Sequence, residues 1–324
     1  MSDTKPWAFD ESLQPRAEDV DFDLAQALDA LVLLHAEIPE DAFTGSILGT
    51  ERVGYGAVFR EDGLVLTIGY LITEAEDIWL TTNAGTVVAA HALAYDQATG
   101  FGLVQPLGEL RAPWLERGSA AALSAGDEVF VLGHGGRSHA LKAKLFAKRE
   151  FAGYWEYLIE DALFTVPAHP QWGGAALLDT GGRLVGIGSL LVEESLGEES
   201  EQGNMFVPID LIEPILADLL AHGRAAREPR PWLGMYTQQE DGRLIVGGLA
   251  PRGPAERAGV RSGDLVLGVA GERTLSLADF LRKVWRLGAP GVEVPLMLAR
   301  EGDVLRLSVR SADRSDFLKK PRLH

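Results

Sequence analysis

Short apolar runs separated by turn signals fill the stretch from about residue 50 to about residue 190. Runs of Val, Leu, Ile and Phe are broken by the segments REDG, TNAG, SAGD and DTGG. Many short strands with turns at this spacing are typical of an all-β barrel or sandwich, because helices need longer periodic segments. This alternation of short apolar runs and turn signals constrains the fold more than any other feature and predicts a mostly β protein.

A helix is expected before the β-rich region. Residues 21–36 carry apolar side chains close to a helical repeat, at Phe22, Leu24, Leu28, Leu31 and Leu34. Asp21 or Asp23 can serve as the N-cap, and Pro39 can stop the helix. We therefore expect residues 1–45 to form an N-terminal arm with one amphipathic helix.

A domain boundary is expected after the β-rich region. The segment NMFVPIDLIEPILADLLAHG predicts a strand and then a helix closed by Gly223, and a Pro-rich, charged link, RAAREPRPW, follows it. We therefore predict one domain over residues 46–226, a smaller one over 231–312 and a basic tail over 313–324 that frays. The acidic segment EESLGEES is interpreted as a solvated surface loop between two strands.

Charge and composition exclude several classes of function. A formal net charge of −17 argues against nucleic acid or an anionic membrane as partner, because both would repel the chain. The absence of cysteine excludes disulfides, thiolate metal sites and a cysteine nucleophile. The N-terminus carries acids where a secretory leader carries Lys or Arg, and no window approaches the roughly 18 apolar residues that span a bilayer. We therefore expect a soluble, cytoplasmic protein.

Three segments of the β-rich region match known motifs: GYGAVFREDGLVLTIGYL, HALAYDQATGFGLVQP and HPQWGGAAL, the last running without a gap into LLDTGGRLVGI. They resemble the segments of the HtrA/Deg family of trypsin-like serine proteases that hold the catalytic histidine, aspartate and serine. The resemblance extends from about residue 45 to about residue 312. It implies a chymotrypsin-like double β-barrel followed by an α+β PDZ domain.

The resemblance places Tyr70, Gly100 and Gly173 where the family has histidine, aspartate and serine. Serine attack needs an imidazole base and a buried carboxylate that orients it. Tyrosine, with an ordinary pKa near 10, is a poor base at neutral pH, and glycine supplies neither nucleophile nor carboxylate. We therefore expect no enzyme. An oxyanion hole would use the N–H groups of Gln171 and Gly173, and Trp172 could fill the cleft beside it.

Three histidines allow other interpretations. His169 could be a displaced base, but a hydrogen-bonded loop histidine is favoured. His134 and His139, in GHGGRSHALK, could suggest a metal or phosphate site, yet no carboxylate cluster accompanies them and the segment resembles a loop of the family. We assign no metal, no nucleotide and no other cofactor.

The C-terminal region resembles a bacterial PDZ domain, with GPAERAGVRSGDLVLGVAGE and SLADFLRKVWRLG as its hallmark segments. The resemblance places the carboxylate loop at Leu233, Gly234 and Met235, whose N–H groups would converge on a chain-terminal carboxylate or on a main-chain carbonyl. The strand from Tyr236 would offer an edge for β-augmentation, opposite a helix over about 277–287. The alternative is a PDZ domain that only packs against the barrel.

Taken together, these patterns favour a non-catalytic, HtrA-like pseudoprotease that acts as a chaperone-like scaffold or assembly module. Its expected partner is a protein or peptide C-terminus or an extended segment, with no nucleic acid and no membrane. One alternative is an active serine-type hydrolase with relocated catalytic residues, and another is a regulatory subunit of an active protease paralogue. The resemblance also implies a homotrimer or a hetero-assembly with such a paralogue.

Overall fold

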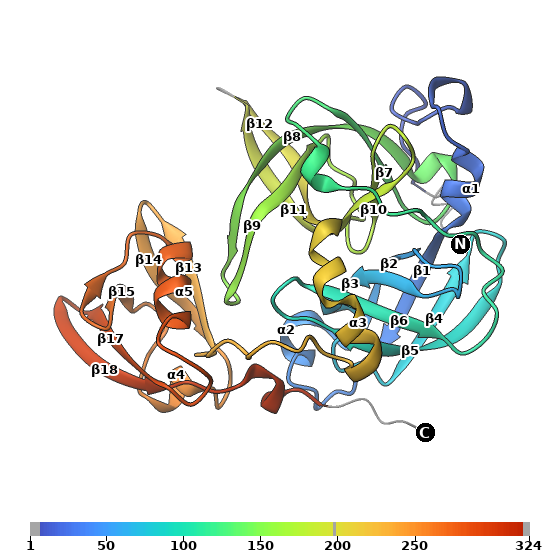
Figure 1. Ribbon diagram of the computed structural model, residues 1–324. Coiled ribbons are helices and arrows are strands. Elements are labelled where there is room, and N and C mark those ends of the chain that lie inside the picture. Colours follow the sequence, from blue (N-terminus) through green and yellow to red (C-terminus); the bar gives the residue numbers. More distant parts are fainter. Residues whose placement is uncertain (1–6, 197–198, 320–324) are drawn as a thin grey trace, which may run out of the picture. The chain divides into compact units, whose positions relative to one another are not determined.

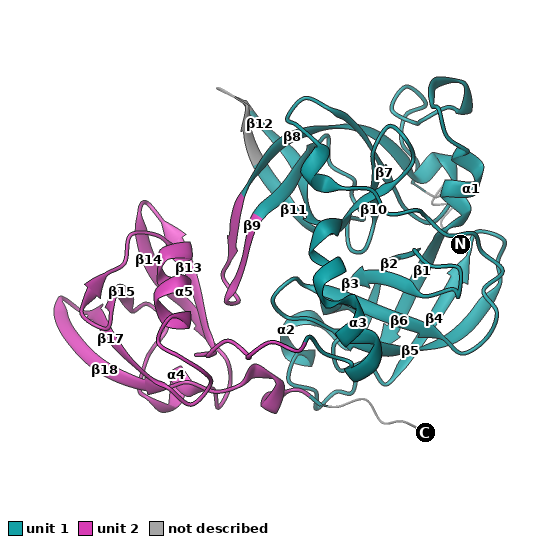
Figure 2. Ribbon diagram, in the orientation of Figure 1, with its two compact units in different colours: residues 1–149, 161–225, 319–324 teal, residues 150–160, 226–318 magenta. Residues whose placement is uncertain are grey.

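The computed structural model describes residues 7–196 and 199–319, which form two compact units (Figure 1). Unit 1 contains the chain up to Arg149, residues 161–225 and the end of the chain from Lys319. Unit 2 contains Glu150–Glu160 and Ala226–Leu318 (Figure 2). The chain therefore enters unit 2 twice, first with a short internal segment and then with the C-terminal region.

Unit 1 is built from two closed, antiparallel six-stranded barrels. The first barrel has the strand order β1-β2-β3-β6-β5-β4, and the second has the order β10-β11-β12-β9-β8-β7. The strands of the first are β1 Leu31–Glu37, β2 Glu51–Val58, β3 Val65–Ile68, β4 Asp77–Thr82, β5 Val87–Tyr95 and β6 Phe101–Pro106. Those of the second are β7 Glu128–Leu132, β8 Ala140–Gly153, β9 Tyr157–Val166, β10 Ala176–Leu178, β11 Leu184–Leu196 and β12 Glu199–Pro208. The predicted mostly β, double-barrel fold is confirmed.

Successive side chains of a strand point alternately into and out of the barrel, and the inward-pointing ones are apolar. In the second barrel, Val129 and Val131 of β7 pack with Leu141 of β8 and Leu177 of β10. Closure pairs the backbone groups of every strand, so that neither barrel exposes a long sheet edge.

Short helices complete unit 1: η1 Ala17–Asp19, α1 Leu24–Asp29, α2 Gly45–Leu48, η2 Gly69–Leu71, η3 Ala120–Ala122, η4 Arg137–His139, η5 Ile209–Leu211 and α3 Glu213–His222. Helix α3 ends at Gly223, whose φ of 68° closes the last turn as the sequence predicts. Over the part of the chain that the structure describes, helices fall short of the length and apolar character that membrane crossing requires.

Unit 2 is a six-stranded antiparallel sheet with two α-helices and a short 3-10 helix. The main path is β13-β14-β15-β17-β18, and β16 pairs with β15. The elements are β13 Met235–Glu240, β14 Arg243–Leu249, α4 Pro254–Arg257, β15 Leu265–Val269, β16 Glu272–Arg273, α5 Leu277–Trp285, β17 Glu293–Arg300, β18 Asp303–Arg310 and η6 Arg314–Phe317. Helix α5 buries Phe280, Leu281 and Val284 in the core of the unit, as its 3.6-residue apolar pattern predicts.

The predicted N-terminal helix over 21–36 is mostly wrong. Only Leu24–Asp29 is helical, capped by Asp23, whose side chain accepts a hydrogen bond from the N–H of Gln26. Residues 31–37 form β1, which pairs with β2 on one side and β4 on the other. A short apolar run such as LVLLHA is compatible with both the helical and the strand period. Here the strand forms because it pairs with a neighbouring strand on each side.

Three other segments differ from the sequence interpretation. The acidic segment belongs to the β11–β12 hairpin, with Glu193 opposite Gln202, and residues 197–198 lie outside the described part. The start of the tail does not fray, because the ring of Phe317 packs at 4.9 Å on that of Trp232; residues 320–324 are outside the described part. Residues 150–160, assigned by sequence to the domain over 46–226, group with unit 2.

Candidate functional site

The three positions aligned with the protease triad lie close together in unit 1. A Cβ placed on Gly173 would lie 2.9 Å from the hydroxyl oxygen of Tyr70. The carbonyl of Gly100 accepts a hydrogen bond at 2.7 Å from the N–H of Gly69, the residue before Tyr70. The barrels thus gather these positions as the sequence alignment requires, although the residues differ from those of a triad.

Tyr70 occupies the space that a serine side chain at position 173 would need. It follows β3 in η2, and its hydroxyl donates a hydrogen bond at 3.0 Å to the carbonyl of Ser189. Burial raises the pKa of Tyr70, against a smaller opposing effect of a hydrogen bond with the Trp172 side chain. The phenol therefore stays protonated at neutral pH and fills the site as a neutral group.

Gly100 has a backbone conformation that aspartate disfavours. Its φ is 84°, in the left-handed region that favours glycine. The turn before it is held by Asp96, whose Oδ2 accepts hydrogen bonds from the N–H and the hydroxyl of Thr99, at 2.9 and 2.7 Å. A carboxylate here would have to come from a strained residue.

The N–H of Gln171, expected in an oxyanion hole, has a partner inside the protein. It donates to Nδ1 of His169 at 3.1 Å, and Nε2 of the same ring lies 3.1 Å from the carbonyl of His139. These contacts place the ring proton on Nε2. Burial is the main effect that lowers the pKa of His169, to about 4. His169 is therefore a neutral, hydrogen-bonded loop histidine, and an oxyanion would have to compete with its ring for this N–H.

His139, considered together with His134 for a metal or phosphate site, has contacts within the protein. His139 Nδ1 lies 3.1 Å from the carbonyl of Gly135, and its ring packs edge-on against Trp7. Among residues 7–196 and 199–319, groups of three or more metal-ligating side chains that could hold an ion are not found.

Unit 2 contains a loop in which three N–H groups converge on one carboxylate. The N–H groups of Leu233, Gly234 and Met235 donate to the side chain of Glu156, at 3.0, 2.6 and 3.0 Å. Gly234 has a φ of 72°, which turns successive N–H groups toward the same point. Burial raises the pKa of Glu156 to about 7, opposed by these three hydrogen bonds and by the charge of Arg314.

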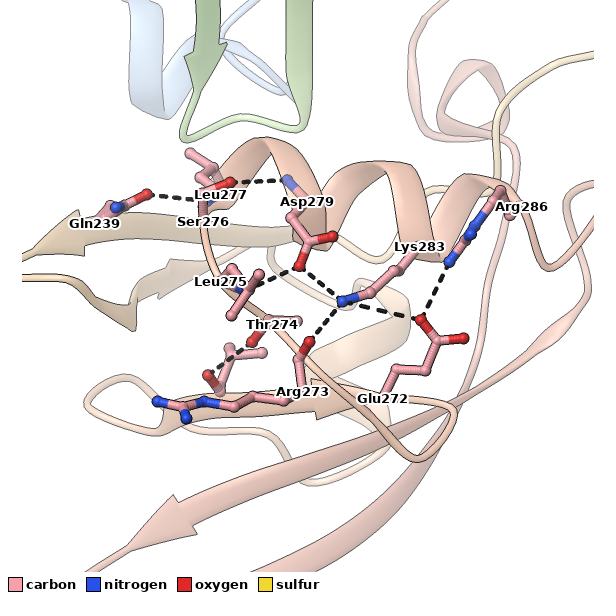
Figure 3. Close-up of polar contacts among 11 residues, drawn as sticks. Gln239, Glu272, Arg273, Thr274, Leu275, Ser276, Leu277, Asp279, Lys283 and Arg286 are labelled. Atoms are coloured by element: carbon pink, nitrogen blue, oxygen red, sulfur yellow. Dashed lines mark hydrogen bonds and ion pairs between the residues drawn. The ribbon is translucent and has the colours of Figure 1, made fainter.

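A strand and a helix flank this loop. Strand β13 continues from it, and the N–H of Thr237 donates at 3.1 Å to the carbonyl of Tyr154. Helix α5 is fixed to β13 because Gln239 Oε1 accepts from the N–H of Leu277 at 3.0 Å (Figure 3). Ser276 caps the helix by accepting from the N–H of Asp279. The loop, strand and helix are the parts from which a peptide groove is made.

Glu156 is a residue of this candidate site that the sequence did not reveal. It lies in the segment FAGYWEYLIE, at the turn between β8 and β9, 77 residues before Leu233. A single acid among aromatic residues is a weak signal, because nothing local shows where its carboxylate goes.

Comparison with known proteins finds a family match in the barrel region and another in the C-terminal region. Residues 54–187 match the trypsin-like peptidase domain family, and residues 245–291 match the PDZ domain family. The chain therefore joins a trypsin-like peptidase domain to a PDZ domain. It is 25% identical over 281 residues to a probable periplasmic serine endoprotease DegP-like of Halomonas elongata, covering 82% of this chain and 58% of the relative. It is also 24% identical over 274 residues to the serine endoprotease DegS of Haemophilus influenzae, covering 81% and 77%.

Further relatives and solved structures show the same architecture. Protease Do-like 1, chloroplastic, of Arabidopsis thaliana is 28% identical over 272 residues, covering 76% of this chain and 60% of the relative. The chain thus spans little more than half the length of several relatives. Its fold is similar to those of the HtrA-type protease AlgW with tripeptide and with decapeptide, each with a TM-score of 0.51 and 19% identity, covering 92% and 93% of this chain and 97% and 100% of theirs.

Two expectations from the sequence are corrected by these relatives. The expectation of no enzyme is contradicted, because the relatives are named serine endoproteases, which points to a protease. That expectation relied on the side chains at three positions, which bear on one mechanism only. The expected cytoplasmic location is also contradicted, because relatives are named periplasmic endoproteases, which points to a location outside the cytoplasm. The composition of the first residues was too narrow a basis for a location.

Proposed function

We propose that this HtrA-type protein binds the carboxyl-terminal ends of protein chains in the groove formed by the 233–235 loop, β13 and α5. The observation that carries the proposal is the convergence of three N–H groups on the Glu156 carboxylate. Hydrogen bonds to a charged acceptor are stronger than neutral ones, so a loop of this geometry favours a carboxylate over an amide. The PDZ match and the related structures with peptides support peptide binding.

The edge of β13 supplies the second part of the proposed recognition. An extended peptide can pair with this strand next to Tyr236, where the N–H of Thr237 already donates to a carbonyl. Binding of this kind suits a scaffold or assembly role, in a homotrimer or together with a protease paralogue.

Peptide hydrolysis is the second candidate function, favoured by the names of the relatives. Tyr70, Gly100 and Gly173 offer no nucleophile and base of the usual kind, so hydrolysis would use other residues. Fluorophosphonate labelling followed by peptide mapping tests this candidate. A residue labelled stoichiometrically, with labelling lost on denaturation, identifies the nucleophile, whereas an unlabelled native protein removes the serine-hydrolase form of this proposal.

The binding proposal is tested with one peptide in two forms. The probe copies residues 149–155 and ends in leucine (Arg-Glu-Phe-Ala-Gly-Tyr-Trp-Leu), with a fluorescein label and either a free α-carboxylate or a terminal amide. Fluorescence anisotropy on the full chain should show tighter binding of the acid than of the amide, by about 1 to 3 kcal/mol. Equal affinities would contradict carboxylate recognition.

Gly234→Ala and Gly242→Ala form a matched pair of variants. Both glycines have a positive φ, 72° and 74°, so alanine strains the backbone at both. At position 234 a Cβ would also approach Ala250 to 3.0 Å, whereas at 242 nothing lies within 4 Å. We expect the preference for the acid to disappear in Gly234→Ala and to persist in Gly242→Ala.

A further inference from the structure

The groove of unit 2 already holds a carboxylate from the same chain. Glu156 is buried, and its two carboxylate oxygens receive the N–H groups of all three loop residues. In the proposed function these N–H groups bind the terminal carboxylate of a partner. Glu156 and a partner's chain end therefore compete for the same donors.

The main chain before Glu156 also follows the path of a bound peptide. The carbonyl of Tyr154, two residues earlier, accepts from the N–H of Thr237 in β13, and the ring of Tyr154 lies 6.1 Å from that of Tyr236. A peptide that ends at the loop and pairs with β13 would make the same main-chain contact two residues before its end. The resemblance thus includes the strand edge as well as the carboxylate.

Side chains on both arms of the hairpin hold it in this position. Leu158 is buried in the core of unit 2, and Ala152 packs against that core. Arg282 of α5 forms an ion pair with Glu150 on one arm and lies 3.8 Å from Glu160 on the other. Figure 3 shows the end of the hairpin, in green, beside α5.

The backbone of Glu156 is in a conformation that glutamate disfavours. Its φ is 64°, in the left-handed region where glycine is the usual residue. A glutamate at this turn position costs conformational energy that a glycine would avoid. The carboxylate bound by the loop offsets that cost, which indicates that the side chain is held for its contacts.

We infer that the 150–160 hairpin is an internal ligand of the peptide groove, and that a protein chain end binds only by displacing Glu156. This inference rests on the proposed function, because it assumes that the groove accepts a chain-terminal carboxylate. Protein chain ends that bind with high intrinsic affinity are then selected, since they alone outcompete a tethered carboxylate at high effective concentration.

The test compares the full-length wild type with Glu156→Gln and Glu156→Gly, using the labelled octapeptide acid and its amide. Glu156→Gln keeps the size of the side chain, and Glu156→Gly removes the carboxylate while relieving the positive φ. Asp161→Asn is the control, because it makes the same change of an acid to its amide on an exposed residue of β9 directly after the hairpin. If the hairpin is docked in at least about 90% of wild-type molecules, both Glu156 variants should bind the acid at least about tenfold more tightly.

The outcomes separate the two proposals. Tighter binding in both Glu156 variants and unchanged binding in Asp161→Asn supports the internal ligand. A clear acid preference with the same affinity in wild type and both Glu156 variants overturns the internal ligand and leaves the proposed function standing. Equal binding of acid and amide by Glu156→Gly overturns the proposed function itself. Because Glu156→Gly relieves strain at the turn, poor folding of Glu156→Gln alone would not obscure the result.

Discussion

Replacing Gly173 by serine tests whether Tyr70 really fills the site. A Cβ at position 173 would lie 2.9 Å from the Tyr70 hydroxyl, closer than real side chains approach, so the phenol must move. Overpacking of this kind costs about 1 to 3 kcal/mol. Moving the phenol also weakens its hydrogen bond to the Ser189 carbonyl, worth about 1 kcal/mol. Replacing glycine also lowers the conformational entropy of the unfolded chain, which stabilises the folded protein by about 0.4 to 1 kcal/mol. We therefore expect a net destabilisation of about 1 to 3 kcal/mol.

The same change in a Tyr70→Phe background should alter the free energy of unfolding only slightly. Without the hydroxyl, the nearest Tyr70 atom to the new Cβ is the ring carbon Cζ at 3.8 Å, an ordinary contact distance. The double-mutant cycle should therefore give a coupling free energy of about 1 to 3 kcal/mol. Gly108→Ser is the control: its Cβ would have only the ordinary 3.4 Å contact with Val88, and we expect a change within about 0.5 kcal/mol.

Hydrogen exchange, measured for individual peptides at increasing urea concentration, separates the unfolding transition of unit 1 from that of unit 2. The relevant signal comes from β10 and β11 peptides. If Gly173→Ser costs the same free energy in the wild-type and Tyr70→Phe backgrounds, the phenol does not occupy the serine position, and the description of this site fails.

Two further predictions concern pH. Burial raises the pKa of the docked Glu156 to about 7 from an ordinary 4.5, so docking is most stable below about pH 4.5 and loses at most about 3 kcal/mol as the pH rises through 7. The charge of Arg314 and the side chain of Tyr236 also interact with this carboxylate. Wild-type affinity for the octapeptide acid, divided by that of Glu156→Gln, should therefore rise from pH 5 to pH 8, and a ratio that stays constant would count against the docked carboxylate. Burial lowers the pKa of His169 to about 4 from an ordinary 6.5, so this residue contributes stability above pH 6.5 that is lost as the pH falls through 4. Melting curves should show this loss in wild type but not in His169→Gln. An equal loss in both proteins would assign it to other groups.

Patterns local in sequence predicted the barrels, the helix of unit 2 and the resemblance that aligns Tyr70, Gly100 and Gly173. Alternating strands and turn signals are short-range properties, so they can be interpreted without knowing the neighbours. The same reasoning failed for residues 31–37, because the choice between helix and strand was made by pairing with β2 and β4. Competition between local preference and tertiary pairing is decided by contacts that a single segment does not reveal.

The contacts that define both sites join residues far apart in the chain. The Tyr70 hydroxyl reaches the Ser189 carbonyl, 119 positions away, and Glu156 reaches Gly234, 78 positions away. The motif around Gly173 predicts an oxyanion hole, but only the folded chain shows that the Gln171 N–H is already bonded to His169. Sequence therefore locates these sites, whereas their occupants follow from the packing.

The carboxylate loop of unit 2 does not distinguish the source of the carboxylate that it binds. Its donors are main-chain N–H groups, which contact only the two oxygens of the acceptor, so the side chain of Glu156 and the end of another chain satisfy it in the same way. The apparent affinity for a partner is then the intrinsic affinity multiplied by the fraction of molecules in which the hairpin is released. The ratio of the octapeptide dissociation constants of wild type and Glu156→Gly consequently measures that fraction directly. A change elsewhere in the chain that alters the docking of the hairpin would change partner binding without touching the loop.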